Sequence, residues 1–323
     1  MRRFLAAAIV VAAVTFGGGA THAPAATTST CPDLQACLDE IASATARAQT
    51  FATSSTSTTV APTTTSSSSS TTTTTVLAAG NVPVGVGGTW HQTFGDEFTA
   101  LTLDRTKWNT WGSWERNDGG RSNVGNGELD YKTDGANFAF DGNTLTIQAR
   151  RETAPNGYAW TSGQIGSVQA FTYGYIETRA RFASPAGFLN AFWTWGAPGT
   201  NASAQETDAY EFYTDNHTRL YLTSHAGAGG GCQGVTLSFD PTLQMHVYGA
   251  DIEPGHTDWY IDGQLRCSAA GAPTQAWNIV DYMTVNSCST TAYGQPSKNR
   301  APCAAASTTH AEKVIDYVRA WSH

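Results

Sequence analysis

The segment QETDAYEFY, residues 205–213, places three carboxylates within six positions, at Glu206, Asp208 and Glu211. This crowding stands out because only 26 of the 323 residues are acidic. Like charges held close together on a half-buried strand repel one another and cost stability. The segment is therefore a solvated strand face, a set of calcium ligands, or a group of side chains that performs acid–base chemistry.

Strand geometry decides whether these carboxylates can act together. Side chains alternate along a strand, so Glu206 and Asp208 share a face, whereas strict alternation turns Glu211 away. A β-bulge within residues 208–210 would add one residue and return Glu211 to that face. Two carboxyls roughly 5–5.5 Å apart suit a retaining glycosidase, with one as nucleophile and the other as general acid/base. The charge of Asp208 would help to keep one glutamate protonated while the other is ionised.

Aromatic residues and the net charge favour a carbohydrate partner. The chain has 10 Trp and 12 Tyr, and Trp193 and Trp195 lie in AFWTWGA, shortly before the acidic segment. Sugar rings present apolar C–H faces that pack on such side chains. The net charge of −8 argues against nucleic acid as a partner, because phosphate binding needs clustered Lys and Arg.

Strands must position these residues. From about Asn81 to His323, short runs rich in β-branched and aromatic residues alternate with Gly, Asn and Asp turns, as in NTLTIQARR, YGYIETRARF, TRLYLTSH and KVIDYVRAW. Hardly any helical period interrupts them. The pattern predicts an all-β fold in which two antiparallel sheets pack as a β-sandwich within one domain, residues 81–323.

The first 80 residues have a different composition. Residues 1–25 begin with Arg2-Arg3, continue with an apolar stretch and end in small residues, which predicts a secretory signal peptide cleaved after Ala25. The apolar stretch is shorter than the roughly 20 residues of a membrane span. We therefore expect a secreted, extracellular protein with no membrane contact after cleavage. Residues 26–50 form a small Cys-containing segment, and residues 51–80 form a Ser/Thr-rich linker.

The cysteines indicate disulfides. An even number of cysteines in an exported chain predicts up to three bridges, and zinc is disfavoured because no C-x-x-C pattern occurs. We prefer pairing between neighbours, although six cysteines permit many other connectivities. The preferred pairs are Cys31–Cys37, Cys232–Cys267 and Cys288–Cys303.

Several segments, taken in order, resemble glycoside hydrolase family 16, especially its laminarinase-like and agarase-like branches. They are FGDEFTALTLDRTKWN, GNGELDYKTDGANFAFDGNTLTIQARRE, TSGQIGSVQAFTYGYIETRARF, HVYGADIEPGHTDWYIDGQL and VIDYVRAW, and they cover residues 81–323 almost end to end. The resemblance implies a β-jelly roll with an open substrate cleft and hydrolysis with retention of configuration.

The resemblance also implies residue roles. It assigns the nucleophile to Glu206, the assisting carboxylate to Asp208 and the acid/base to Glu211. The implied substrate-binding residues are Trp193, His225 and Asn126. Catalysis requires no cofactor, but some members hold a structural calcium, whose matching ligands are Glu97, the carbonyl of Gly142 and Asp316. Solvation of these two carboxylates, or pairing with Arg319, is the alternative.

The resemblance is incomplete around the substrate. GFLNAFW places Leu189 and Asn190 where laminarinases typically have Trp and Pro, and DYMTVNSCSTT replaces the usual LNLAVGG and carries Cys288. Our leading prediction is a secreted, monomeric, retaining endo-β-1,3-glucanase acting on a polysaccharide. The alternatives are an endo-β-galactanase or agarase-like hydrolase, and a non-catalytic carbohydrate-binding protein on the same scaffold.

Overall fold

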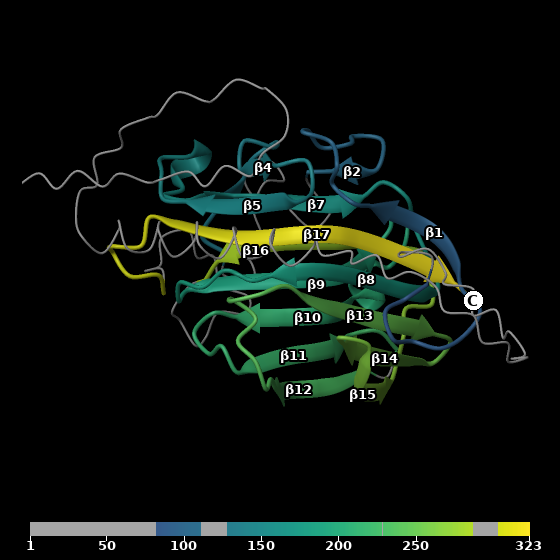
Figure 1. The fold of residues 1–323 in the computed structure, drawn as a ribbon. Coiled ribbons are helices and arrows are strands. Elements are labelled where there is room, and N and C mark those ends of the chain that lie inside the picture. The colour runs from purple at the N-terminus through teal and green to yellow at the C-terminus, as the bar shows by residue number, and fades with distance from the viewer. Residues whose placement is uncertain (1–81, 111–127, 228, 287–302) are drawn as a thin grey trace, which may run out of the picture. The chain divides into compact units, whose positions relative to one another are not determined.

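The structure is a computed structural model that describes residues 82–110, 128–227, 229–286 and 303–323. Regular structure in these residues is almost entirely β-strand, with short 3₁₀ turns at Pro155–Gly157 and Ala202–Gln205. The strands form two sheets that lie one over the other (Figure 1). The predicted two-sheet β-sandwich is thus confirmed. The predicted signal peptide, the Cys-containing segment and the linker lie outside the described residues and stay predictions.

Sheet A has the strand order β15-β14-β13-β8-β17-β5-β6-β3, and β1 also pairs with β17 and β4 with β5. All of its pairs are antiparallel except the short β3–β6 pair. Its strands are β1 His91–Asp96, β3 Tyr131–Lys132, β4 Phe138–Phe140, β5 Leu145–Arg150, β6 Thr161–Ser162, β8 Gly174–Arg181, β13 His246–Glu253, β14 His256–Ile261, β15 Gln264–Ala270 and β17 His310–Ser322.

Sheet B has the order β12-β11-β10-β9-β16-β7-β2 and is antiparallel throughout. Its strands are β2 Trp108–Asn109, β7 Gln164–Ser167, β9 Phe188–Gly196, β10 Thr207–Tyr213, β11 Arg219–Ser224, β12 Gly230–Thr236 and β16 Trp277–Val285. The acidic segment therefore lies in β10, near the middle of this sheet.

Alternating apolar residues build the core between the sheets. In β5, for example, Leu145, Ile147 and Ala149 are fully buried while their neighbours are half-buried. At the centre, Phe182 packs on Tyr210 of sheet B and on Tyr248 of sheet A, with ring centroids 4.6 and 4.7 Å apart. Burial of such large rings is the main stabilising contribution in a sandwich of this kind.

One ion pair crosses this core. Lys313 of β17 and Asp281 of β16 form it, and both side chains are completely buried. The ammonium group also donates to the backbone carbonyls of Ala191, at 3.0 Å, and Tyr282, at 3.2 Å. Burial raises the pKa of Asp281 to about 6, against the opposing charge of Lys313. This core ion pair connects sheet A to two strands of sheet B.

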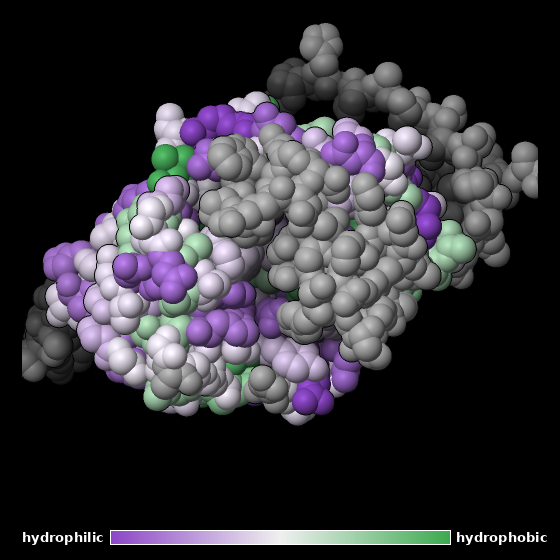
Figure 2. Space-filling view, turned by 180° about the vertical axis from the view of Figure 1, so that it is seen from behind, coloured by the Kyte–Doolittle hydropathy of each residue, from purple (hydrophilic) through white to green (hydrophobic). Residues whose placement is uncertain are grey.

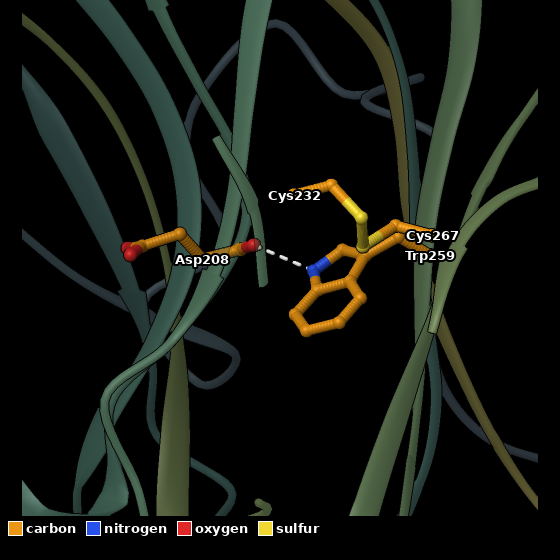
Figure 3. Close-up of a disulfide and its surroundings, with 4 residues drawn as sticks. All are labelled: Asp208, Cys232, Trp259 and Cys267. Carbon is orange, nitrogen blue, oxygen red and sulfur yellow. Dashed lines mark hydrogen bonds between the residues drawn. A yellow bond between two sulfur atoms is a disulfide. The ribbon is translucent and has the colours of Figure 1, made fainter. Parts of the chain in front are cut away.

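A disulfide joins the sheets at one edge. Cys232 of β12 and Cys267 of β15 are bonded, which confirms that predicted pair (Figure 3). Closing a loop over a sequence separation of 35 contributes about 4 kcal/mol to stability in the chain-entropy description. Cys303 is also disulfide-bonded. The predicted partner Cys288 lies outside the described residues, as does the predicted pair Cys31–Cys37.

The described surface is largely polar. In the view of Figure 2, hydrophilic and intermediate residues predominate, and hydrophobic residues form small separate patches. The large hydrophobic residues that are exposed are spread along the chain: Val84, Leu101, Val168, Tyr173, Leu243 and Leu265. Within the described part of the chain, no helix has both the length and the apolar character that a membrane crossing requires.

Candidate functional site

A β-bulge in β10 gives the acidic segment its shape. Asp208 pairs with Trp193 of β9, but Tyr210 pairs with the next residue, Phe192, so Ala209 is the extra residue. The register with β11 shifts at the same place. The bulge predicted within residues 208–210 is therefore present. After it, Glu211 lies opposite Ala191 of β9.

The bulge separates polar from apolar side chains. Tyr210 and Phe212 belong to the core between the sheets. Ala191 and Trp193, which lie opposite Glu211 and Asp208, belong to a separate apolar cluster instead. The carboxylates therefore lie on the face of sheet B that is turned away from the core. We call this set of side chains the acidic face: Glu206, Asp208 and Glu211.

His225 completes the acidic face. It follows β11, and its backbone N–H donates to the carbonyl of Glu206 at 2.9 Å. Its ring nitrogen Nε2 lies 3.1 Å from Oδ2 of Asp208. The imidazole is half exposed, whereas the Asp208 side chain is 5% exposed. One ligand atom from each of Glu206, Asp208 and His225 lies within 4.8 Å of the others.

Burial and mutual charge change the acidity of these groups. Burial raises the pKa of Glu206 to about 7, and the charge of Asp208 adds to the rise while His225 opposes it. Burial also raises the pKa of Asp208 to about 7, with Glu211 adding to the rise. The pKa of Glu211 is raised by burial as well, against the hydrogen bond from Tyr213. The hydrogen bond to Asp208 raises the pKa of His225 to about 9. Near neutral pH, a charged imidazole therefore faces carboxyls that hold protons more tightly than exposed ones.

The bulge is held from the other sheet. The indole nitrogen Nε1 of Trp259, in β14 of sheet A, donates to the backbone carbonyl of Asp208 at 2.7 Å (Figure 3). Trp259 pairs with Cys267, whose disulfide fastens the two sheets beside it. Sequence reasoning uses HVYGADIEPGHTDWYIDGQL for the family resemblance and does not single out Trp259. The signal it missed is the N–H of a buried Trp, which needs an acceptor.

Aromatic side chains surround the acidic face. Trp193 contacts Trp195 and Tyr282, with ring centroids 5.6 and 5.8 Å apart. The hydroxyl of Tyr213 donates to Oε1 of Glu211 at 3.0 Å. Trp193 thus lies beside the carboxylates with only 6% of it exposed, and its substrate-binding role stays a prediction. Sequence reasoning did not single out Tyr213 or Tyr282.

The two departures within GFLNAFW lie on opposite faces of β9. Leu189 joins Trp193 in the apolar cluster beside the acidic face and is 7% exposed. Asn190 is fully buried, and its Oδ1 accepts a hydrogen bond from the backbone N–H of Ala183 at 3.1 Å. Of these two residues, only Leu189 therefore lies on the side of the carboxylates.

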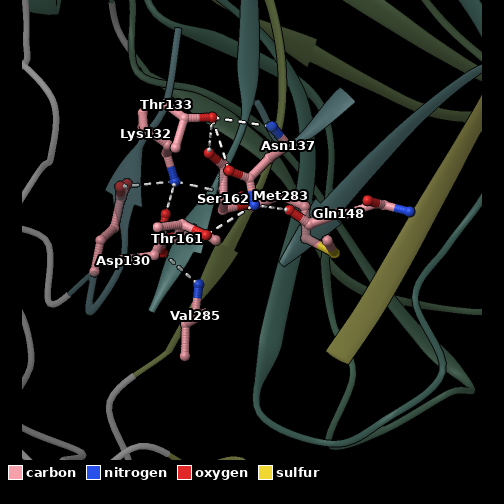
Figure 4. Close-up of polar contacts among 11 residues, drawn as sticks. Asp130, Lys132, Thr133, Asn137, Gln148, Thr161, Ser162, Met283 and Val285 are labelled. Atoms are coloured by element: carbon pink, nitrogen blue, oxygen red, sulfur yellow. Dashed lines mark hydrogen bonds and ion pairs between the residues drawn. The ribbon is translucent and has the colours of Figure 1, made fainter. Parts of the chain in front are cut away.

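A second buried charged cluster was missed in the sequence. Nζ of Lys132 lies 2.5 Å from Oδ2 of Asp130 and 3.5 Å from Oε2 of Glu128 (Figure 4). Burial raises the pKa of Glu128 to about 7, against the charge of Lys132. Tyr282 lies near both clusters, because its ring is 5.1 Å from Nζ of Lys132 and 5.8 Å from Trp193. Burial raises the pKa of Tyr282, and the charges of Glu128 and Glu211 add to the rise. The signal in GELDYK was charge at every second residue of an extended segment.

The remaining predicted site residues are the calcium ligands and Asn126. Glu97 forms a two-pronged ion pair with Arg319, both contacts at 2.7 Å, as the alternative anticipated. Asp316 pairs with Arg179 at 2.6 Å. Each of these carboxylates thus faces a guanidinium group, and the calcium site stays a prediction. Gly142 occupies a turn with φ of 86°, and Asn126 lies outside the described residues.

Comparisons with known proteins agree with this architecture. An endo-β-1,3-glucanase structure from Pyrococcus furiosus superposes with a TM-score of 0.60 at 25% identity, covering 72% of this chain and 94% of that one. A β-glucanase of Paenibacillus polymyxa is 27% identical over 161 residues, 49% of this chain and 64% of the relative. The endo-1,3-1,4-β-glycanase EglC of Rhizobium meliloti (strain 1021) is 28% identical over 250 residues, 72% of this chain and 51% of the relative.

The matches to these two relatives therefore span between half and two thirds of their length. The sequence pattern of the glycosyl hydrolases family 16 matches residues 125–302, which is more than half of the chain and includes all of the acidic face. This match agrees with the jelly-roll arrangement of two antiparallel sheets. The chain belongs to glycosyl hydrolases family 16.

Proposed function

We propose that this protein is a secreted, monomeric endo-β-glucanase that hydrolyses β-1,3-linked glucan with retention of configuration. One observation carries the proposal: the bulge in β10 places Glu206, Asp208 and Glu211 on one outward face with His225. The names of the similar proteins, which are a β-glucanase, an endo-β-1,3-glucanase and an endo-1,3-1,4-β-glycanase, support the substrate class. Secretion rests on the composition of residues 1–25 alone.

In the proposed mechanism, Glu206 attacks the anomeric carbon while Glu211 donates a proton to the departing glycosidic oxygen. A covalent glycosyl-enzyme intermediate forms, and water then hydrolyses it with Glu211 acting as base. The hydrogen bond from Tyr213 to Glu211 stabilises the carboxylate that remains after proton donation. No metal or cofactor is needed for these steps.

Asp208 and His225 influence the reaction by changing the pKa of the nucleophile, Glu206. The charge of Asp208 raises the pKa of Glu206 and so opposes its ionisation. Protonated His225, paired with Asp208, offsets that charge and lets Glu206 ionise at neutral pH. The aromatic side chains beside these groups offer apolar surface to the C–H face of a sugar ring.

The test measures reducing-end release by the full chain on laminarin, mixed-linkage β-glucan, agarose, carrageenan and galactan. We expect cleavage of laminarin and a loss of at least about a thousandfold in Glu206→Gln, because no nucleophile remains. Glu312→Gln is the matched control, since this carboxylate lies on sheet A and is 41% exposed. NMR of the first product should show the β-anomer. An initial α-anomer would refute retention.

Other results of this experiment would support one of the alternative functions. Cleavage of agarose or galactan, lost in Glu206→Gln, would keep the hydrolase and replace the substrate. Leu189 makes this the leading alternative, because a smaller side chain stands where laminarinases typically have Trp. Retention on a polymer without cleavage would identify a carbohydrate-binding protein instead.

The roles of the two glutamates are distinguished by the leaving group. Glu211→Gln should lower the rate on polysaccharide by about 100-fold to 10,000-fold, because the sugar leaving group needs a proton. Aryl glycosides with acidic phenols need little protonation, so their rate should fall much less. Equal losses on both substrates would remove Glu211 from the acid/base role.

A further inference from the structure

Another polar cluster lies on the outer face of sheet A. It consists of Asp251 and Glu253 in β13 and His323, the last residue of the sequence, just after β17. Their neighbours Ala250 and Ile252 point into the core, so these carboxylates point away from it. This His323 cluster is therefore on the opposite side of the sandwich from the acidic face.

The spacing of its atoms is that of a metal site. Nε2 of His323 lies 3.0 Å from Oε1 of Glu253 and 3.4 Å from Oδ1 of Asp251. One ligand atom from each residue lies within 4.8 Å of the others. Ligand atoms that bind tetrahedral zinc at about 2.0–2.1 Å lie about 3.3 Å from one another. The three atoms can thus surround one ion after small adjustments.

Asp251 supplies a second, independent observation. The residue is only 9% exposed, and the His323 ring, 3.4 Å away, is the only group within hydrogen-bonding reach that is described for its Oδ1. Buried carboxylate oxygens are normally satisfied by a donor or a cation. Asp258 pairs with Asp251 across β13 and β14, which adds a further negative charge. The carboxylates of Asp251, Glu253 and Asp258 therefore lie near one another. The ring of His323 is the group that lies against Asp251.

The histidine is held in place for this role. The His323 ring packs against Trp90 with centroids 3.9 Å apart and ring planes tilted by 37°, and the indole nitrogen of Trp90 donates to the carbonyl of Gly87. The ring is still 48% exposed, so solvent can reach the ligand atoms. A fixed ligand loses little conformational freedom on binding, which favours affinity.

We infer that Asp251, Glu253 and His323 form a binding site for a divalent transition-metal ion, with zinc as the best match. One imidazole nitrogen and two carboxylate oxygens are a borderline ligand set that suits zinc better than calcium or magnesium. Water from the exposed side completes the coordination. The bound ion fastens the end of β17 to β13 and, through Trp90, to the segment before β1.

The experiment uses the full chain, purified without a histidine tag or added C-terminal residues and stripped with a chelator. Zinc binding is measured by equilibrium dialysis and by thermal unfolding. We expect His323→Gln and Glu253→Gln each to lose one equivalent of bound zinc. With zinc at about a hundred times its dissociation constant, the melting temperature of the unsubstituted protein should rise by about 5–10 °C.

Two control variants locate the ion. His310→Gln removes an equally exposed histidine of β17 that faces one carboxylate, Glu312, and should bind as much zinc as the unsubstituted protein. His225→Gln removes a ligand atom from the acidic face, the other described group with metal-ligand spacing, and should also keep the equivalent held by His323. Unchanged zinc stoichiometry in both His323→Gln and Glu253→Gln would overturn the inference. Absence of any zinc binding would overturn it too.

Discussion

The molecule buries carboxylates in two ways. In the core ion pair, Asp281 faces the ammonium of Lys313, which also donates to two backbone carbonyls of sheet B. On the acidic face, three carboxylates share the half-exposed imidazole of His225. Burial raises the pKa of Asp281 to about 6, and that of Asp208 to about 7.

The difference lies in how well the charges are matched. The core ion pair has one positive group for one negative group, so its cost of burial is largely offset. The acidic face has more carboxylates than cations, and burial there disfavours ionisation without full compensation. A surplus of this kind costs stability but supplies groups that exchange protons near neutral pH, which is what acid–base catalysis needs. Matched charge therefore serves the fold, and unmatched charge serves the proposed chemistry.

The largest expected effect is on stability, when the positive partner of the core ion pair is removed. Lys313→Met leaves Asp281 as an uncompensated buried charge and should lower the free energy of unfolding by about 3–5 kcal/mol. Denaturant unfolding at pH 7 measures this loss. The double variant Lys313→Met/Asp281→Leu removes both charges and should recover most of it. A double variant as unstable as the single one would show that packing, rather than charge matching, is the main contribution.

The sequence predicted the sandwich because alternation and turn residues are local signals. It also predicted the bulge, since three carboxylates could act together only if Glu211 turned back. Apart from the Cys232–Cys267 disulfide, contacts between the sheets could not be predicted, because the strand pattern carries no information on how two sheets stack. Lys313 meets Asp281 from 32 residues away, and Trp259 reaches Asp208 across 51. The ion pair between Glu97 and Arg319, 222 residues apart, was anticipated only as an alternative to the calcium site, which stays a prediction.

The next effect tests whether the acidic face costs stability. The folded-state pKa of Glu206 is raised from 4.5 to about 7 by burial. Its contribution to stability is therefore complete below pH 4.5 and is lost as the pH rises through 7. Glutamine cannot ionise, so Glu206→Gln should gain about 1–3 kcal/mol at pH 8 and almost nothing at pH 4.5. Thermal unfolding across this pH range gives both values.

Glu312→Gln is the matched control for that gain. Although partial burial opposes it, hydrogen bonds from His310 and Gln148 lower the pKa of Glu312. Its stabilising contribution is therefore present at high pH and lost on acidification, so the substitution should destabilise the protein above pH 5. If Glu206→Gln also destabilised the protein at high pH, as expected for Glu312→Gln, the charges of the acidic face would be as well compensated as those of the core ion pair. The contrast between the two regions would then be wrong.

The smallest expected effect is on the pH dependence of kcat/KM. It measures how far the charge of His225 compensates the three carboxylates of the acidic face. This charge lowers the pKa of Glu206, Asp208 and Glu211. His225→Gln should therefore move both limbs of the kcat/KM profile to higher pH by about 0.5–1 unit, because nucleophile and acid both become harder to ionise.

His217→Gln is the control for this shift. That histidine pairs with Asp240, at 3.0 Å, and not with a carboxylate of the acidic face. A merely structural His225 would lower the rate at every pH and leave both limbs in place. A shift to lower pH would contradict the proposal, because it would mean that His225 raises the pKa of these carboxyls instead of lowering it. The shift to higher pH is the expected result, because the hydrogen bond to Asp208 keeps His225 protonated up to a pKa of about 9.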